Sequence, residues 1–170
     1  MTRPQSSVTM RPARHEDADT IARLSRDLIE TGLGWSWTPE RVSRAIRDRN
    51  TATLIAAERD RVVAFAIMYF GDEHAHLSLL AVQPSHQRQG LGRRLMAWMM
   101  DTIAVAGIAT VHLELRTSNY AARRFYRALG FTETAYIPGY YRGREMALRM
   151  VKALRDPSAP LPAWAPPRIH

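Results

Sequence analysis

The sequence predicts an α/β (α+β) domain built on one mixed central β-sheet of about seven strands, flanked by about four helices. Apolar runs typical of strands recur along the chain, and between them lie segments with apolar residues at three- and four-residue intervals, which is the helical period. One strand and two helices are followed by strands joined through short turns, and strands and helices then alternate. This order favours a mixed sheet with helices on both faces.

Length and composition fit a single domain. The chain has 170 residues, of which 46% are hydrophobic, enough to bury one core. We expect a flexible N-terminus over residues 1–7, one domain over residues 8–154, and an extended proline-rich tail over residues 155–170. No apolar run reaches membrane-spanning length and the N-terminus lacks an apolar signal core, so the sequence predicts a cytoplasmic protein with no membrane partner.

Cysteine and charge content narrow the possible functions. The chain has no cysteine, which excludes disulfides, thiolate metal sites and a cysteine nucleophile. The formal net charge is +8, and Lys152 is the only lysine, so arginine supplies the excess. A positive field attracts anionic ligands, nucleic acid or acidic protein surfaces, although an arginine-rich surface without a specific partner is the alternative. No nucleic-acid-binding motif is present, and we therefore expect no specific nucleic-acid partner.

The first elements are a strand and two helices. Residues 8–12 form a predicted edge strand, which a proline ends. A helix follows over about residues 17–30. Thr38 and Pro39 then have the residue types of an N-cap and a first helical position, which predicts a second helix to about residue 48.

Six further strands and two further helices follow. Residues 59–61 predict a hairpin between the first two of these strands. A long helix starts at Leu91 and ends near Gly107, and a shorter one is capped by Asn119. Residues 138–144 predict a turn before the last strand. The expected strands cover residues 52–58, 62–70, 75–82, 110–116, 131–137 and 145–151.

A glycine-containing loop connects the strand of residues 75–82 to the long helix. Gly90 and Gly92 lie where the loop becomes helix, and without a Cβ they let backbone N–H groups come close to a ligand. The first N–H groups of a helix have no partner within it, and the helix dipole adds positive potential. The loop therefore predicts an anion site, most naturally for a phosphate or pyrophosphate, with a plain tight turn as the alternative. It matches neither the P-loop nor the three-glycine dinucleotide fingerprint.

Two motifs, in this order, resemble the GNAT superfamily of N-acetyltransferases. The first is Gln87-x-x-Gly90-x-Gly92 after a strand, which resembles the family's loop for the pyrophosphate of acyl-coenzyme A. The second is Leu113-Glu114-Leu115-Arg116-Thr117-Ser118-Asn119, followed by an F-Y-x-x-x-G-F run that ends at Phe131. The resemblance extends over the whole predicted domain. It implies the GNAT fold, in which the central strands are splayed.

Within this superfamily the sequence is most similar to the N-terminal protein acetyltransferases, including the ribosomal-protein-alanine type. The likeness implies acetyl-CoA as cosubstrate, with its pantetheine arm between the splayed strands, its pyrophosphate on backbone N–H groups of residues 87–93, and Asn119 bonded to the end of the arm. The residues that it assigns to coenzyme binding are Leu80, Ala81, Val82, Gln87, Arg88, Gln89, Gly90, Leu91, Gly92, Arg93, Asn119, Ala122 and Tyr126.

The resemblance also implies catalytic roles for Glu114, as a base acting through a water, and for Tyr126, as the acid at the coenzyme sulfur. The residues alone leave other interpretations open. Glu114 could simply pair with Arg116 or another arginine on its strand face, and Tyr126 could be a packed core residue. His112 shares the strand face of Glu114 and is an alternative base. His74, His76 and His86 have no carboxylate or cysteine at a sequence spacing typical of a metal site, so we expect no metal.

The acceptor site is expected in the last hairpin and the loop between the first two helices. Tyr140 and Tyr141 match a tyrosine pair of the similar acetyltransferases, and Glu145 matches an acidic residue after it. Those proteins usually carry a second acidic residue next, where this chain has Met146, and this weakens the substrate assignment. Trp35 either lines an acceptor pocket or holds its glycine-broken loop on the core.

Together these features predict an acetyl-CoA-dependent N-acetyltransferase that acts on a primary amine, with the α-amine of a protein or peptide N-terminus as the expected acceptor. A small-molecule amine acetyltransferase for amino acids, polyamines or antibiotics is the first alternative, and a non-catalytic acyl-CoA sensor is the second. The likeness allows association with the ribosome. The sequence leaves open whether the protein is a monomer or a homodimer.

Overall fold

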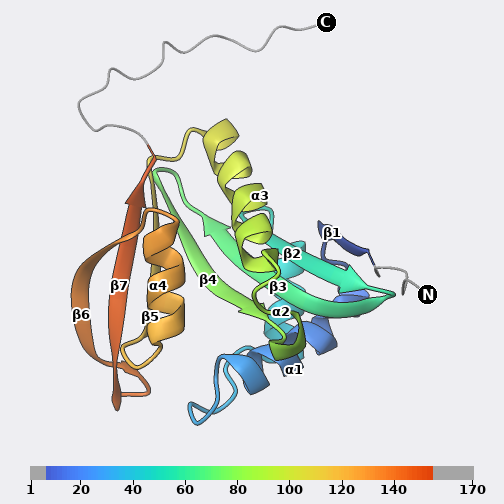
Figure 1. Ribbon diagram of the computed structural model, residues 1–170, viewed down its shortest axis with the longest axis horizontal. Coiled ribbons are helices and arrows are strands. Elements are labelled where there is room, and N and C mark those ends of the chain that lie inside the picture. The colour runs from blue at the N-terminus through green and yellow to red at the C-terminus, as the bar shows by residue number, and fades with distance from the viewer. Residues whose placement is uncertain (1–6, 155–170) are drawn as a thin grey trace, which may run out of the picture.

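The computed structural model describes residues 7–154, which form a seven-stranded sheet with four α-helices (Figure 1). The strands are β1 (Val8–Pro12), β2 (Thr51–Glu58), β3 (Arg61–Phe70), β4 (His74–Val82), β5 (Thr110–Arg116), β6 (Thr132–Tyr141) and β7 (Glu145–Ala153). The helices are α1 (Ala18–Leu28), α2 (Pro39–Arg47), α3 (Leu91–Ala106) and α4 (Tyr120–Ala128), with short 3-10 turns at His15–Asp17 and Pro84–His86. The predictions for residues 1–6 and for the tail of residues 155–170 lie outside the described residues.

The sheet is mixed, as the sequence predicted. Its strand order is β1-β2-β3-β4-β5-β7-β6, and β4 and β5 run parallel while all other neighbours are antiparallel. β1 lies at one edge, as expected. The sequence did not predict that the last strand, β7, inserts between β5 and β6.

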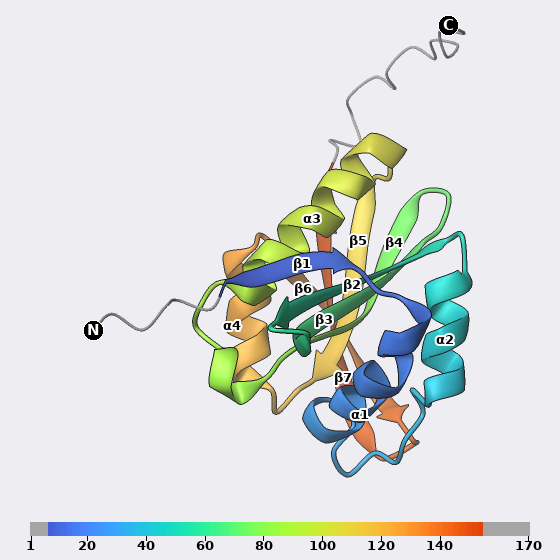
Figure 2. The same ribbon diagram turned by 90° about the vertical axis from the view of Figure 1, so that its right-hand side faces the viewer.

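Helices cover both faces of the sheet (Figure 2). On one face α3 and α4 bury a core that includes Met99 of α3 and Leu113 of β5. On the other face α1 and α2 bury a second core, with Ile21, Val42 and Phe65 fully enclosed. This second core takes residues from β2, β3 and β4 but none from β5. The face of β5 that carries Glu114 is therefore not part of a hydrophobic core.

The parallel strands β4 and β5 diverge soon after they begin. They pair from His74 opposite Thr110 to His76 opposite His112, and both strands continue beyond this last pair without pairing with each other. The edge of β4 that follows His76 is thus open toward β5. This is the splayed pair of central strands that the family resemblance implied.

The last hairpin differs from the prediction. The turn expected over residues 138–144 is shorter, because β6 continues to Tyr141 and only Arg142, Gly143 and Arg144 connect it to β7. The ladder of β6 and β7 slips between Ile137 and Tyr141, so the chain bulges instead of turning. Gly139 permits this bulge with a φ of 65°.

Several local sequence signals have their predicted structure. Thr38 caps α2 by accepting the Arg41 N–H, with Pro39 at the first helical position. Asn119 caps α4 by accepting the Ala122 N–H at 3.1 Å. Gly107 ends α3 in the left-handed conformation. Within residues 7–154, no helix is long and apolar enough to cross a membrane.

Candidate active site

The predicted anion loop, residues 87–93, leads into α3. Gly90 is the N-cap, with a φ of 79°, and a Cβ added there would meet no atom within 4 Å. Arg88 also has a positive φ, of 61°. The first backbone bond within α3 runs from the Arg94 N–H to the Gly90 carbonyl at 3.0 Å. The N–H groups of the three residues before Arg94 therefore precede the helical bonds and are free to bind an anion in the open space beside Gly90.

Gly92 fixes the position of this helix start against α4. A Cβ added at Gly92 would lie 3.2 Å from Cζ of Phe125 and 3.8 Å from Cγ2 of Val82. The missing side chain thus brings the first turn of α3 against an aromatic ring of α4 and the end of β4. The anion loop is held beside the opening in the sheet by this contact.

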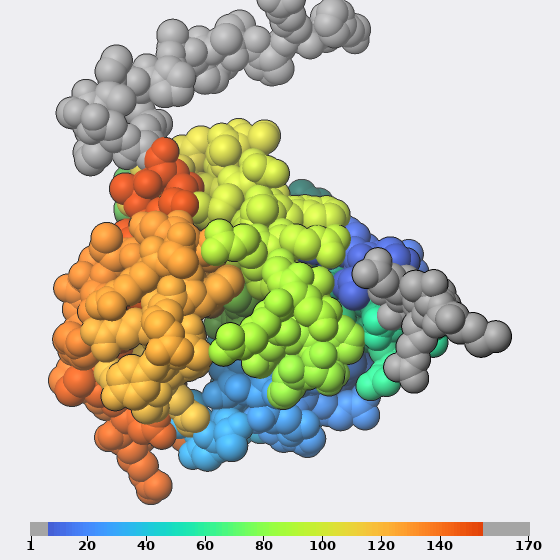
Figure 3. Space-filling model, in the orientation of Figure 1, coloured from blue at the N-terminus to red at the C-terminus, as the bar shows by residue number. Residues whose placement is uncertain are grey.

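The opening begins next to the loop. Leu80, Ala81 and Val82 lie on β4 beyond its last pair with β5. The Gln87 side chain donates to the Val82 carbonyl at 3.1 Å and so ties the loop to the end of this strand. Figure 3 shows the surface hollowed between α4, in orange and yellow, and the loop before α3, in light green. Leu80 and Val82 of β4 and Ala122 of α4 pack against the same core cluster.

Glu114 lies on the opposite face of β5 from α3 and α4, and its side chain is only 5% exposed. One carboxylate oxygen accepts a hydrogen bond from Nε2 of His76 at 2.6 Å, and the other contacts the Arg149 guanidinium at 2.9 Å. Burial alone would raise the pKa of this carboxyl, but the hydrogen bonds and charges of His76 and Arg149 outweigh it and lower the pKa below its usual value. Glu114 is therefore ionised at neutral pH.

Two histidines meet beside Glu114. His76 and His112 form the last pair of β4 and β5, with ring centroids 4.7 Å apart. Burial, and then the neighbouring His76, lower the pKa of His112, so this imidazole is neutral at pH 7. Ligand atoms of His76, His112 and Glu114 lie within 4.8 Å of one another, close enough to surround a cation. However, both Glu114 oxygens already have partners, and the adjacent guanidinium of Arg149 opposes a second positive charge.

Tyr126 lies on the α3–α4 side of the sheet. Its ring packs edge-on against Phe125 at 5.1 Å and Phe131 at 5.6 Å. Burial, and then the nearby Tyr141, raise the pKa of its hydroxyl, which therefore stays protonated. A protonated phenol suits a proton donor, and the packing explains why the residue also has the spacing of a core aromatic.

The tyrosine pair of β6 connects the two sides of the opening. The rings of Tyr140 and Tyr141 meet edge-on at 4.9 Å, so they do not stand apart as in a regular strand. Burial and the charge of Glu114 raise the pKa of Tyr140, whereas Tyr141 interacts with both Tyr140 and Tyr126. Tyr140 is therefore close to the predicted base. Tyr141 is close to the predicted acid, and the charge of Glu114 also raises its pKa.

The α1–α2 loop lies against the same hairpin. Arg142 packs so closely on Gly34 that a Cβ there would be within 3 Å of the guanidinium. Arg116 donates to the Thr31 carbonyl at 2.5 Å and pairs with Glu145 at 3.1 Å. These contacts join the two segments in which the sequence predicted the acceptor site.

Trp35 has the contacts of a packing residue. Its indole N–H donates to the Ala22 carbonyl of α1 at 3.1 Å, and Arg26 lies over its ring at 5.1 Å. Glu30, which is buried just after α1, accepts hydrogen bonds from the backbone N–H groups of Ser36 and Trp37. The geometry favours the loop-anchoring alternative for Trp35, and its role in acceptor binding stays a prediction.

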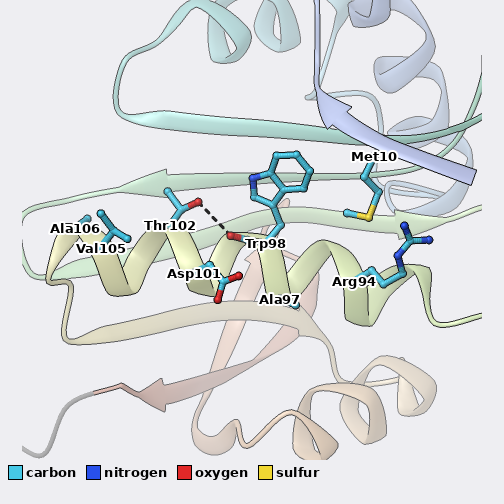
Figure 4. A pocket seen from close by; sticks show the side chains of 8 residues that line it. All are labelled: Met10, Arg94, Ala97, Trp98, Asp101, Thr102, Val105 and Ala106. Atoms are coloured by element: carbon cyan, nitrogen blue, oxygen red, sulfur yellow. Dashed lines mark hydrogen bonds between the residues drawn. The ribbon is translucent and has the colours of Figure 1, made fainter.

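Two surface hollows lie outside the coenzyme region. The larger, of about 940 Å³, is formed by Met10 of β1 and the outer side of α3, where Trp98 is prominent (Figure 4). None of the predicted site residues lines it. The smaller, of about 610 Å³, lies beside the paired ends of β4 and β5, and its walls include His76 and His112. It therefore adjoins Glu114 and the two histidines beside it.

Sequence reasoning missed two partners of Glu114. Its alternative that Glu114 pairs with an arginine is confirmed in kind, but the partner is Arg149 of β7, whereas Arg116 pairs with Glu145. It set His76 aside as a metal ligand and gave it no role beside Glu114. Glu114 lies opposite Arg149 in the β5–β7 register. Strand alternation places His76 and Glu114 each on one face of a strand, but only the strand order and register reveal that these faces coincide.

The fold and the two motifs agree with comparisons to known proteins. Residues 20–131 match the acetyltransferase (GNAT) family. The chain belongs to this family. A curated relative, the ribosomal protein bS18-alanine N-acetyltransferase of Escherichia coli K12, is 42% identical over 96 residues, which cover 55% of this chain and 65% of the relative. The matched segment is thus slightly less than two thirds of that protein.

Solved structures match over more of the chain. The ribosomal-protein-S18-alanine N-acetyltransferase of Escherichia coli superposes with a TM-score of 0.76 at 27% identity, covering 90% of this chain and 99% of that one. Ard1 of Thermoplasma volcanium gives a TM-score of 0.77 at 26% identity, covering 88% and 99%. These matches confirm the GNAT fold that the sequence predicted.

Proposed function

We propose that this GNAT protein transfers an acetyl group from acetyl-CoA directly to a primary amine, and that the acceptor is the α-amine of a protein or peptide N-terminus. The observation that carries the proposal is the opening between β4 and β5. The anion loop and Tyr126 lie on one side of it, Glu114 lies on the other, and the tyrosine pair connects the two sides. Coenzyme and acceptor could therefore approach from opposite faces and meet in the gap.

In the proposed reaction, the amine lone pair attacks the thioester carbonyl and the carbon–sulfur bond breaks. Glu114 acts on the ammonium side, where a proton must leave through a water, and Tyr126 gives its proton to the departing sulfur. The chain contains no cysteine, so transfer is direct and not through an acetyl-cysteine. An α-amine, with a pKa of about 7.7–8.0, loses its proton more readily than lysine at about 10.4.

The acceptor class rests on a likeness and on the acceptor region itself. The curated relative and the solved structure from Escherichia coli are both named as alanine N-acetyltransferases of a ribosomal protein. In this chain Tyr140 stands beside Glu114, and the hairpin is joined to the α1–α2 loop by Arg142 and Arg116. Such a surface suits a peptide chain that lies between two loops. A ribosomal protein is the acceptor that the likeness favours.

The first experiment measures thiol release from acetyl-CoA with short peptides that begin with alanine or serine, run beside spermidine and free amino acids. We expect turnover on the peptides and a loss of about 10²–10³-fold in kcat/KM for Glu114→Gln. The matched control is Asp101→Asn, an exposed carboxylate on α3, which should leave the rate unchanged.

Other results of this acceptor panel would support one of the two alternative functions. Turnover on small amines alone would replace the peptide acceptor with a small-molecule one and reduce the tyrosine pair to packing. Coenzyme binding without turnover on any amine, with Glu114→Gln indistinguishable from the parent protein, would identify an acyl-CoA sensor.

A further inference from the structure

The carboxylate assigned to the base has two strong partners in this chain. Glu114 is held by His76 through a 2.6 Å hydrogen bond and by Arg149 at 2.9 Å, and its side chain is almost fully enclosed. These partners stabilise the ionised form of the carboxyl and lower its pKa. A carboxylate in this environment orients a proton acceptor well but is a poor place for a proton to stay.

We propose that Glu114 and His76 act as one base unit, in which His76 is the group that holds the proton taken from the acceptor amine. This inference rests on the proposed function. A carboxylate can only accept, so the 2.6 Å contact requires a proton on Nε2 of His76 and leaves a lone pair on Nδ1 of a neutral ring. The carboxylate fixes this tautomer and stabilises the imidazolium that forms.

The proton balance is simple. One N–H bond of the acceptor ammonium breaks, and its electron pair stays on the nitrogen that attacks the thioester. One N–H bond forms at Nδ1 of His76, through a water that passes a proton on and is left unchanged. Glu114 remains a carboxylate throughout, and the imidazolium of His76 afterwards returns its proton to solvent. The nitrogen loses its second proton as the amide forms, and this proton replaces the one that Tyr126 gives to the departing sulfur.

The surroundings of His76 provide the exit for that proton. His76 lines the hollow of about 610 Å³, and its side chain is 30% exposed. His112 stacks beside it at 4.7 Å and is neutral, because burial and His76 lower its pKa, so the ring next to His76 adds no competing positive charge. Asp72 and Glu73 also line the hollow.

Three other titratable residues lie near His76. Tyr69 of β3 lies opposite His76 in the sheet and lines the same hollow. His74 bonds Oγ1 of Thr110 at 2.5 Å, and Arg149 reaches the far oxygen of Glu114. Among the described residues the histidine bonded to Glu114 is His76, and His74 is a neighbouring histidine without that bond.

The test compares His76→Gln with His74→Gln in the full-length protein, using whichever acceptor the peptide and amine panel shows to be turned over. For His76→Gln we expect kcat to fall by about tenfold or more at neutral pH, an unchanged KM for acetyl-CoA, and loss of the imidazole-range limb of the kcat/KM pH profile. Added imidazole should restore part of the rate. His74→Gln should keep the parent profile.

A second measurement does not depend on activity. Nitrogen-15 NMR of the histidine side chains should show His76 as the Nε2–H tautomer in the neutral ring, and Glu114→Gln should weaken the preference for this tautomer. An Nδ1–H tautomer, or a parent-like pH profile in His76→Gln, would overturn the inference and leave Glu114 as the base alone. Absence of turnover on every amine by the parent protein would instead count against the proposed function, and the tautomer would still decide whether the dyad exists.

Discussion

The two faces of the split between β4 and β5 are built in different ways. On the α3–α4 face, the anion loop is a contiguous segment that offers backbone N–H groups, and packing contacts such as Gly92 on Phe125 hold it in place. On the opposite face, side chains from β4 and β7 converge on Glu114 of β5 through charge and hydrogen bonds. In the proposed function, coenzyme binding thus depends on local backbone geometry, whereas the proton chemistry depends on long-range polar contacts.

The largest effect expected on the coenzyme face is that of Tyr126→Phe. Removal of the hydroxyl takes away the proposed proton donor to sulfur but keeps the ring contacts with Phe125 and Phe131. We expect kcat to fall about 10²-fold, with unchanged thermal stability, in steady-state assays and thermal melts. Tyr120→Phe, on an exposed position of the same helix, is the control and should behave as the parent. Parent-like turnover by Tyr126→Phe would leave this tyrosine with a packing role alone.

A smaller effect, on coenzyme affinity, is expected where α3 meets α4. Gly92→Val would press a branched side chain into the Phe125 ring, 3.2 Å from where its Cβ would lie, and we expect a loss of about 1–3 kcal/mol in the free energy of unfolding. The displaced loop should bind coenzyme A about tenfold or more weakly by calorimetry, since about 1.4 kcal/mol of binding free energy corresponds to tenfold.

Gly90→Ala tests the effect of backbone strain without a steric clash. The new Cβ would meet no protein atom, but the φ of 79° costs a non-glycine residue about 1–2 kcal/mol. We therefore expect Gly90→Ala to lower the free energy of unfolding through backbone strain alone, without the packing defect of Gly92→Val. Unchanged coenzyme affinity in Gly92→Val would show that the helix contact does not set the position of the loop.

The same contrast explains what the sequence predicted and what it did not. The N-caps Thr38 and Asn119, the glycine at Gly107 and the loop before α3 are local, and each was predicted because a few adjacent residues determine the backbone there. The pairing of Glu114 with Arg149 was not predicted, because it needs the insertion of β7 beside β5. Long-range strand order leaves no signature in any short stretch of sequence.

The last hairpin is an intermediate case. Proline and glycine at 138 and 139 are ordinary turn residues, and the sequence therefore predicted a turn beginning there. In the structure they form a bulge within β6, because pairing with β7 resumes at Tyr141 opposite Glu145. The competing strand pairing overrode the local preference. As a consequence the tyrosine pair reaches Glu114 and Tyr126 instead of the tip of the hairpin.

On the polar face, which is the face that carries Glu114, Arg149→Met tests how much the guanidinium contributes to the low pKa and to the activity of Glu114 in addition to His76. Loss of its hydrogen bond and charge should raise the pKa of Glu114 toward the ordinary value, as followed by carbon-13 NMR of the carboxyl. Because His76 still holds the other oxygen, we expect less than about a tenfold loss in kcat/KM. A loss as large as that of Glu114→Gln would mean that Arg149 itself takes part in the reaction or in acceptor binding.

The smallest expected effect is on the acid dependence of stability. The pKa of Glu114 is lower in the folded protein than the value of about 4.3 for an unfolded chain, so its ionised form stabilises the fold above that pH. This contribution is lost as pH falls through the folded pKa, where the carboxyl must protonate while His76 and Arg149 lose their acceptor.

Urea unfolding of the parent protein at a series of pH values between about 5 and 3 should therefore show a decline in the free energy of unfolding, and Glu114→Gln should show a shallower one. Asp17 also has a lowered pKa, because its hydrogen bonds to Arg11 and Arg14 outweigh burial, so part of the decline should remain in this variant. Equal slopes in both proteins would mean that the polar face contributes nothing to stability through Glu114. The contacts around this carboxylate would then serve only to orient it and His76 for proton transfer.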